Sequence, residues 1–88
     1  MAILGYIVQY DKEDDYTSYH GFVKLYRHFS EAFAHAEEMY RDYLERTEGA
    51  VDHHFDVYRP TKKECDERGS VVVFRGVEYL VWIDCVLD

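Results

Sequence analysis

Residues 29–46 read FSEAFAHAEEMYRDYLER, and this segment carries the clearest structural pattern in the chain. Ser30 is a favourable N-cap, Glu31 suits the positive end of a helix dipole, and Gly49 is a natural stop. The apolar residues recur with the helical period, which predicts a single long helix with one buried stripe. This stripe consists of Phe29, Ala32, Phe33, Ala36, Met39, Tyr40, Tyr43 and Leu44.

In the segments before and after this helix, apolar and polar residues alternate as in β-strands. The pattern predicts strands over residues 3–10, 16–27, 51–58, 70–74 and 77–87. The first two form a predicted hairpin, and the last two form a second hairpin around Arg75-Gly76. In the second strand, parity predicts His20, Phe22 and Tyr26 on one face of the sheet. The same parity predicts Tyr19, Val23 and Leu25 on the other face.

The element order β-β-α-β-β-β predicts an α+β fold. We expect an antiparallel sheet of four to five strands with one main helix packed on one face. A chain of 88 residues makes one domain, residues 1–88. No apolar run reaches the roughly 20 residues that a membrane helix needs. The N-terminal residues lack the basic segment of a signal peptide, and two cysteines are too few for a disulfide framework, so we expect a cytoplasmic protein.

The last predicted strand is apolar on both of its faces. One row consists of Tyr79, Val81, Ile83, Cys85 and Leu87, and the other row contains Leu80, Trp82 and Val86. A single helix covers only one face of a sheet, so the second face needs another cover. The charged connection 61–69, with room for a helical turn at 62–67, is one candidate, and another protein is the second. Leu80, Trp82 and Val86 are therefore a candidate dimer or docking face, with a homodimer as the simplest solution.

The charge of the chain is strongly negative, with 18 acidic residues against 10 basic ones and a net charge of −8. This balance argues against direct nucleic-acid binding and favours basic surfaces on other proteins. Glu38 and Asp42 are about 6 Å apart along the helix axis, similar to successive phosphates of a nucleic-acid strand. An equally simple interpretation is a solvated helix face that Arg41 and Arg46 partly neutralise. The helix carboxylates, here called the acidic edge, are Glu31, Glu38, Asp42 and Glu45, and a second acidic cluster consists of Asp11, Glu13, Asp14 and Asp15.

Patterns of catalysis and metal binding are weak in this sequence. His20, Asp52, His53, His54, Asp56, Cys65 and Cys85 supply the ligand types of zinc, but no Cys-x-x-Cys or His-x3-His spacing joins them. Adjacent His53 and His54 point to opposite faces of a strand, and the two cysteines suit buried apolar sites. Glycine-rich phosphate loops are absent, and no nucleophile has a defined base beside it. We therefore expect no enzyme activity, no metal and no cofactor.

Three runs of residues resemble a group of small phage and bacterial proteins. These runs are Tyr6-Ile7-Val8, Tyr16-Thr17-Ser18-Tyr19-His20, and Leu25-Tyr26-Arg27-His28-Phe29-Ser30-Glu31-Ala32 leading into the helix. The group shares a strand, a tyrosine-bearing loop, a second strand and a helix that opens on Phe-Ser-x-x-Ala. In size and charge the chain is similar to phage-encoded inhibitors of bacterial defence, of the anti-CRISPR and anti-restriction type. The resemblance implies a protein that occupies another protein's surface in the host cytoplasm, and it assigns no site residues.

These observations together predict a non-enzymatic acidic protein-binding module. The acidic edge and the loop 11–15 would engage a basic, nucleic-acid-handling surface of a host defence protein, with Tyr16 and Tyr19 as aromatic anchors. One alternative is an immunity protein that neutralises a toxic nuclease through the same charges. Another alternative is a homodimeric structural or assembly module that uses the face of Leu80, Trp82 and Val86.

Overall fold

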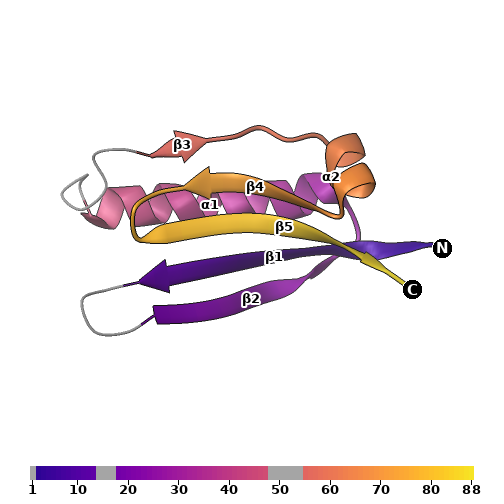
Figure 1. Cartoon of the computed structure of the whole chain (residues 1–88), viewed down its shortest axis with the longest axis horizontal. Helices are drawn as coiled ribbons and strands as arrows, with labels where there is room; N and C mark the ends of the chain where they lie inside the picture. The colour runs from indigo at the N-terminus through magenta and orange to yellow at the C-terminus, as the bar shows by residue number, and fades with distance from the viewer. Residues whose placement is uncertain (1, 14–17, 48–54) are drawn as a thin grey trace.

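Figure 1 shows the fold in a computed structural model, which describes residues 2–13, 18–47 and 55–88. The described elements are β1 (Ile3–Glu13), β2 (Ser18–Tyr26), α1 (Phe29–Thr47), β3 (Asp56–Val57), α2 (Lys62–Arg68), β4 (Ser70–Arg75) and β5 (Tyr79–Leu87). The five strands form one antiparallel sheet in the order β2-β1-β5-β4-β3. Helix α1 lies across one face of this sheet. The predicted α+β fold is confirmed, with α2 in place of the predicted helical turn.

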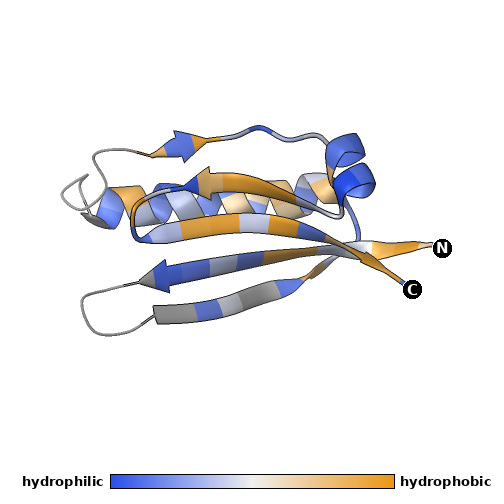
Figure 2. Ribbon diagram, viewed as in Figure 1, coloured by the Kyte–Doolittle hydropathy of each residue, from blue (hydrophilic) through white to orange (hydrophobic). Residues whose placement is uncertain are grey.

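Strand β5 lies at the centre of the sheet, between β1 and β4. It pairs with β1, where Tyr6 lies opposite Cys85 and Val8 opposite Ile83. On its other edge it pairs with β4. Figure 2 shows that the hydrophobic residues concentrate in β4 and β5, whereas α2 is hydrophilic. In the described part of the chain, neither helix has the length and apolarity to cross a membrane.

Helix α1 packs on the sheet through the stripe that its periodicity predicts. Ala32 and Ala36 are fully buried, and their small size lets the helix axis lie close to the strands. Phe29 packs edge-on against Tyr6, with ring centroids 5.5 Å apart. The carbonyl of His28 accepts hydrogen bonds from the first turn, so His28 is the N-cap. The prediction that Ser30 caps the helix is wrong, because the helix begins at Phe29 and Ser30 lies in its first turn.

A bulge in β4 turns two consecutive side chains toward α1. Val72 lies opposite Trp82 and Phe74 opposite Val81, so β4 has one residue more than β5 over this stretch. Val73 and Phe74 are both fully buried as a result. Strict alternation would place these neighbours on opposite faces, and the bulge thereby adds an aromatic ring to the core.

A second bulge corrects the predicted parity of β2. Ile7 lies opposite Leu25 and Gln9 opposite Phe22, so β2 has the extra residue. Tyr26 therefore lies on the α1 side of the sheet, whereas His20 lies on the opposite face with Leu25. The prediction that His20 and Tyr26 share a face is wrong, because a bulge reverses the parity of all residues beyond it.

Helix α2 lies on the same side of the sheet as α1. Thr61 and Glu64 form a capping box at its start, and Gly69 ends it in the left-handed conformation with φ of 83°. Cys65 is fully buried, and the Asp66 carboxylate accepts a hydrogen bond from the Tyr6 hydroxyl at 2.7 Å. Tyr6 belongs to the α1 side of the sheet. The segment 61–69 thus does not cover the second face, so this one of the two candidate covers is ruled out.

Candidate functional site

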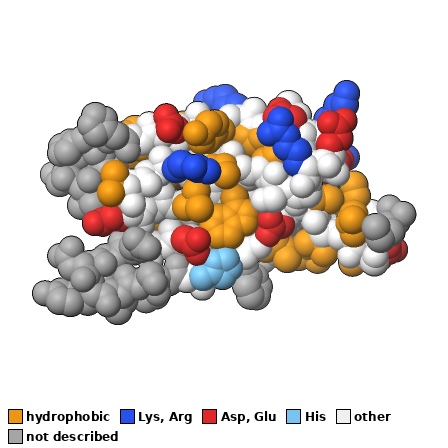
Figure 3. All heavy atoms as spheres, in the orientation of Figure 1, with side chains coloured by type: hydrophobic (Ala, Val, Ile, Leu, Met, Phe, Trp, Pro, Cys, Tyr) orange, Lys and Arg blue, Asp and Glu red, His pale blue; other side chains and the backbone are white. Residues whose placement is uncertain are grey.

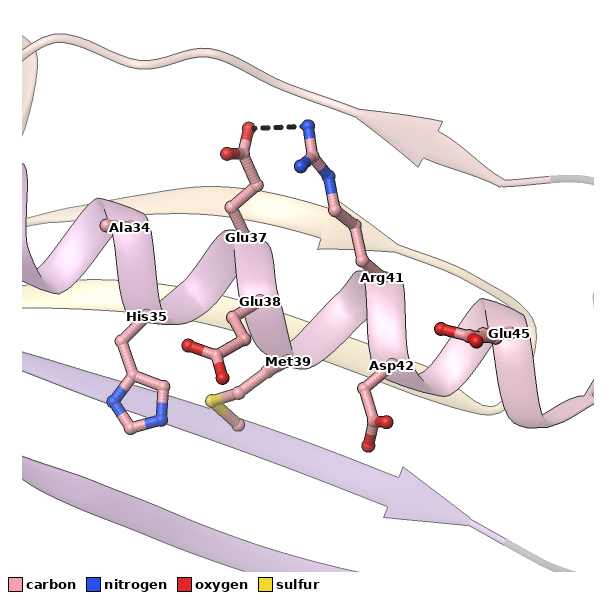
Figure 4. Close-up of a pocket in the computed structure, with 8 residues that line it drawn as sticks. All are labelled: Ala34, His35, Glu37, Glu38, Met39, Arg41, Asp42 and Glu45. Atoms are coloured by element: carbon pink, nitrogen blue, oxygen red, sulfur yellow. Dashed lines mark ion pairs between the residues drawn. The ribbon is translucent and has the colours of Figure 1, made fainter.

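Four carboxylates of the acidic edge, on α1, all have exposed side chains: Glu31, Glu38, Asp42 and Glu45. Figure 4 shows Glu38 and Asp42 pointing toward the side of β1 and β2, and Glu37 and Arg41 toward the side of β3. Arg46 pairs with Asp42 at 3.1 Å and so neutralises part of this edge. Arg41 pairs instead with Glu37 at 3.5 Å, and Arg59 approaches Glu37 at 3.8 Å. The basic side chains therefore neutralise the β3 side of α1 more than its β1–β2 side.

A shallow hollow of about 550 Å³ lies on the outer surface of α1 and is here called the helix hollow. Met39 is half-buried there and lies between Glu38 and Asp42 in Figure 4. A thioether floor with carboxylates around it suits the aliphatic stem and the charged end of an Arg or Lys side chain. The residues that line the hollow are Ala34, His35, Glu37, Glu38, Met39, Arg41, Asp42 and Glu45.

The acidic edge continues onto strand β2 through Tyr26. Its hydroxyl forms a hydrogen bond with Nδ1 of His35, and the two rings meet edge-on at 5.7 Å. Burial, and then the negative charges of Glu38 and Glu31, raise the pKa of Tyr26. The Lys24 ammonium lies 5.1 Å from the centre of the same ring. Glu31 and Glu38 thus act on one tyrosine although they lie seven positions apart in the sequence.

The acidic cluster of the predicted first loop does not join the acidic edge where the structure describes it. Asp11 pairs in register with His20 and Leu80, which puts its side chain on the sheet face opposite α1. Glu13 ends β1 and Tyr19 lies in β2, but their side chains are outside the described set. Asp14, Asp15 and Tyr16 lie outside the described residues altogether.

Leu80, Trp82 and Val86 all lie on the face of the sheet opposite α1, here called the open face, as their parity predicts. Each of these three side chains is half-buried. Figure 3 views this face and shows apolar side chains near its centre, with acidic and histidine side chains beside them. No described helix covers it, since both helices lie on the other side. The open face is thus a second candidate interface.

Polar side chains form a hydrogen-bonded chain across the open face. Nδ1 of His20 lies 2.7 Å from Asp11 Oδ1, and Nε2 of His20 lies 2.8 Å from Gln9 Oε1. The Gln9 amide donates to Asp84. Trp82 extends across β1, so that its ring centroid lies 5.4 Å from that of His20. Each ring nitrogen of His20 thus lies within hydrogen-bonding distance of one side-chain oxygen, from Asp11 or from Gln9.

The sequence pattern does not indicate this chain of polar side chains. The hairpin between β1 and β2 could have indicated the contact of His20 with Gln9 and Asp11, because those strands are neighbours in sequence. The contact between Gln9 and Asp84 spans 75 positions and depends on the central place of β5. No local pattern indicates it.

Comparison with family models, curated proteins and solved structures finds no match to this chain. Chemistry and geometry alone therefore bear on what these surfaces do. The same criteria of chemistry and geometry decide whether the cysteines and histidines could hold a metal.

Cys65, in the middle of α2, and Cys85, near the end of β5, are free thiols. Burial, more than the neighbouring Cys85, raises the pKa of Cys65 to about 12. The Cys65 thiol donates to the Ile83 carbonyl at 3.7 Å, which suits a small buried group rather than a nucleophile. Within residues 2–13, 18–47 and 55–88, no three His, Cys, Asp or Glu side chains come together as a metal site. His53 and His54 lie outside these residues.

Proposed function

We propose that this chain is a non-enzymatic binding module that uses the acidic side of α1 to occupy a basic surface of another protein. The observation that carries the proposal is the helix hollow, where exposed Glu38 and Asp42 flank the half-buried Met39. One Arg or Lys side chain of a partner can place its stem on Met39 and its charge between the two carboxylates. A protein that handles nucleic acid presents such side chains in rows.

The carboxylates on the acidic side of α1 can bind a partner's cation with little loss of existing ion-pair energy. Arg46 and Asp42 are 77% and 55% exposed, and such surface pairs contribute only about 0–1 kcal/mol. A partner cation can therefore replace Arg46 without a large penalty. Among the described residues, Glu38 has no basic group within 4.0 Å. The net charge of −8 adds long-range attraction that accelerates the encounter.

A phage-type inhibitor of a host defence protein is the role that suits this surface best. Such an inhibitor acts in the host cytoplasm and competes with nucleic acid for the basic groove. An immunity protein that neutralises a toxic nuclease would use the same charges. The neighbouring genes distinguish the two roles, because a toxin gene beside this one favours immunity and a phage early region favours inhibition.

The experiment is affinity capture from a host lysate with the wild-type chain and with the double variant E38K/D42K. The control E67K/E78K has the same change of charge away from α1. We expect the wild type and the control to capture the same partner, with less captured as salt is raised, and E38K/D42K to capture none of it. Nuclease treatment of the lysate should increase capture, because it removes the competitor. Equal capture by E38K/D42K and the wild type would reject the acidic side of α1 as the functional surface.

The open face supports a second candidate function, assembly of two copies of the chain. The half-buried Leu80, Trp82 and Val86 side chains on a face without a helix are the observation that favours it. Sedimentation velocity of the wild type at low and high salt tests this function. A dimer held by apolar contacts persists at high salt and is lost in W82E, whereas a monomer under both conditions excludes it.

A further inference from the structure

The basic residues of this acidic chain are concentrated in one part of the molecule. Five of its ten Lys and Arg residues fall between positions 59 and 75, where only three acidic residues occur. Figure 3 shows the described Lys and Arg side chains of the open-face view in its upper half, over β3, β4 and α2. The basic residues of this segment are Arg59, Lys62, Lys63, Arg68 and Arg75. This part of the chain therefore differs in charge from the acidic side of α1.

Three of these arginines line one hollow of about 480 Å³, here called the arginine hollow. The Tyr58 amide donates to the Val73 carbonyl at 2.9 Å, and beyond this bond the chain crosses to α2. The hollow lies among this crossing segment, α2 and β4. Its lining residues are Tyr58, Arg59, Pro60, Glu64, Arg68, Ser70, Val71, Val72 and Arg75.

The lining combines an apolar floor with cationic groups at the rim. Val71 is buried and Val72 is half-buried, and the exposed Tyr58 adds an aromatic ring. Ser70 supplies a hydroxyl group on the same strand. Guanidinium groups beside an apolar floor are the arrangement that holds a small molecule with one anionic end, because the arginine fork matches the oxygens of phosphate.

The existing partners of these arginines are distant. Arg68 lies 4.0 Å from Glu64, and Arg59 lies 3.8 Å from Glu37, while the two arginines are 70% and 73% exposed. Among the described residues that line this hollow, Glu64 is the one carboxylate. Asp56 lies opposite Arg75 in the β3–β4 register, but no described carboxylate comes within 4.0 Å of the Arg75 guanidinium. The three positive charges are thus weakly compensated.

We propose that the arginine hollow binds a small phosphorylated molecule. Its phosphate lies beside the guanidinium groups of Arg68 and Arg75, and its remaining part lies on Val72 and Tyr58, while Arg59, whose guanidinium approaches Glu37 on α1, adds positive charge at the edge of the hollow. The net charge of −8 opposes a long polyanion, whose phosphates would extend past the hollow toward acidic surface. A compact ligand with a single phosphate avoids that repulsion. This site is separate from the acidic edge and does not depend on the function proposed for it.

Titration followed by NMR chemical shifts and by calorimetry tests the site, with adenosine monophosphate, inorganic phosphate and adenosine as probes. We expect both phosphate-bearing probes to shift the amide signals of Ser70, Val72 and Arg75, and we expect adenosine to leave them in place. The variant R68Q/R75Q should weaken the binding of adenosine monophosphate by about tenfold or more, since two charge-assisted hydrogen-bonding groups are lost. R59Q alone should weaken it by a smaller factor.

The matched control is R27Q/K63Q, which removes the same charge from exposed positions outside the hollow. It should bind the nucleotide as the wild type does. Circular dichroism confirms that each variant is folded before it is titrated. The proposal is overturned if no probe shifts these amides, if the control weakens binding as much as R68Q/R75Q, or if adenosine binds as tightly as its monophosphate. A single-stranded oligonucleotide that binds more tightly than the mononucleotide would also overturn it.

Discussion

The ring of Tyr40 on α1 lies flat against the ring of Phe74 on β4, with centroids 5.2 Å apart and planes 7° from parallel. Phe74 is fully buried. Its ring also packs near the rings of Tyr43, Phe55 and Tyr79, with centroid separations of 6.1, 5.5 and 6.1 Å. Tyr43 in turn stacks on Tyr79 at 4.5 Å. These rings join α1 to β4 and β5, and they depend on the bulge that turns Phe74 inward.

We expect Phe74→Ala to lower the free energy of unfolding by about 3–5 kcal/mol, because it leaves a cavity among four aromatic rings. Phe74→Leu should cost less, since it fills part of that space. Urea unfolding followed by circular dichroism measures both changes. Leu4→Ala, at a position 54% exposed, is the control and should change stability by less than about 0.5 kcal/mol. A Phe74→Ala variant as stable as this control would contradict the role of the ring cluster.

Substitution of the glycine that ends α2 should destabilise the fold through the backbone alone. Gly69 has φ of 83°, and nothing lies within 4 Å of the position that a Cβ would occupy. Gly69→Ala should therefore destabilise the fold by about 1–2 kcal/mol through left-handed strain without any clash. Gly69→Asn should cost less, because asparagine tolerates this conformation better. Thermal unfolding of the two variants ranks them, and equal costs would refute the backbone explanation.

The contact of Asp66 with Lys62 and Tyr6 makes stability dependent on pH at both extremes. The hydrogen bond from Lys62, and then that from Tyr6, lower the pKa of Asp66 below 3.8. Its contribution is therefore fully present above pH 3.8 and is lost as the pH falls through the lowered folded value. Burial, and then the hydrogen bond to Asp66, raise the pKa of Tyr6 above 10.0, so stability also falls as the pH rises past that value.

Asp66→Asn and Tyr6→Phe separate these two effects. Denaturation midpoints across the pH range should show a smaller acid-side loss in Asp66→Asn and a smaller alkaline loss in Tyr6→Phe. At neutral pH, Tyr6→Phe should cost about 1 kcal/mol, which is typical of one hydrogen bond. An acid limb in Asp66→Asn as steep as that of the wild type would show that other carboxylates determine it.

The two cysteines should differ in their reaction with iodoacetamide. Cys65 is 0% exposed and its pKa is raised to about 12, so the native protein should not react at this position near neutral pH. Cys85 is half-buried, and burial followed by the charge of Asp66 also raises its pKa, so it should react slowly. In Cys85→Ser, mass spectrometry should show labelling of Cys65 that increases with urea. Rapid labelling of Cys65 in native buffer would mean that α2 opens without global unfolding.

Local patterns were sufficient for most of the secondary structure. The period of residues 29–46 predicted α1, and the two hairpins followed from alternation and from Arg75-Gly76. The predicted third strand, 51–58, coincides with the structure at Asp56–Val57, while residues 51–54 lie outside the described chain. Local pattern could not reveal the bulges in β2 and β4. A bulge is decided by how the strand fits its partner across the sheet, and it reverses the faces that simple parity assigns.

Some features of the candidate site could likewise be predicted from the sequence, whereas others depend on how the strands pair. The helical period alone places Glu38 and Asp42 on one edge of α1, because residues one turn apart share a face of any helix. The pairing of Arg46 with Asp42 follows from the same spacing. Asp11 could not be placed by sequence, since the pairing of β1 with β2 and β5 decides that it faces away from α1. Met39 was predicted as part of the buried stripe, and its partial exposure gives the helix hollow a floor.

Local sequence patterns were enough to predict an α+β fold with one amphipathic helix, an apolar last strand and a strongly acidic surface. Periodicity and composition are local properties, so they can be recognised in the sequence without knowledge of which strands pair. The packing of distant segments placed both helices on one side of the sheet and turned Phe74 inward. It also brought Arg59, Arg68 and Arg75 around one hollow and joined Gln9 to Asp84. Those arrangements depend on contacts between distant segments, whose register is determined when the whole sheet packs against α1.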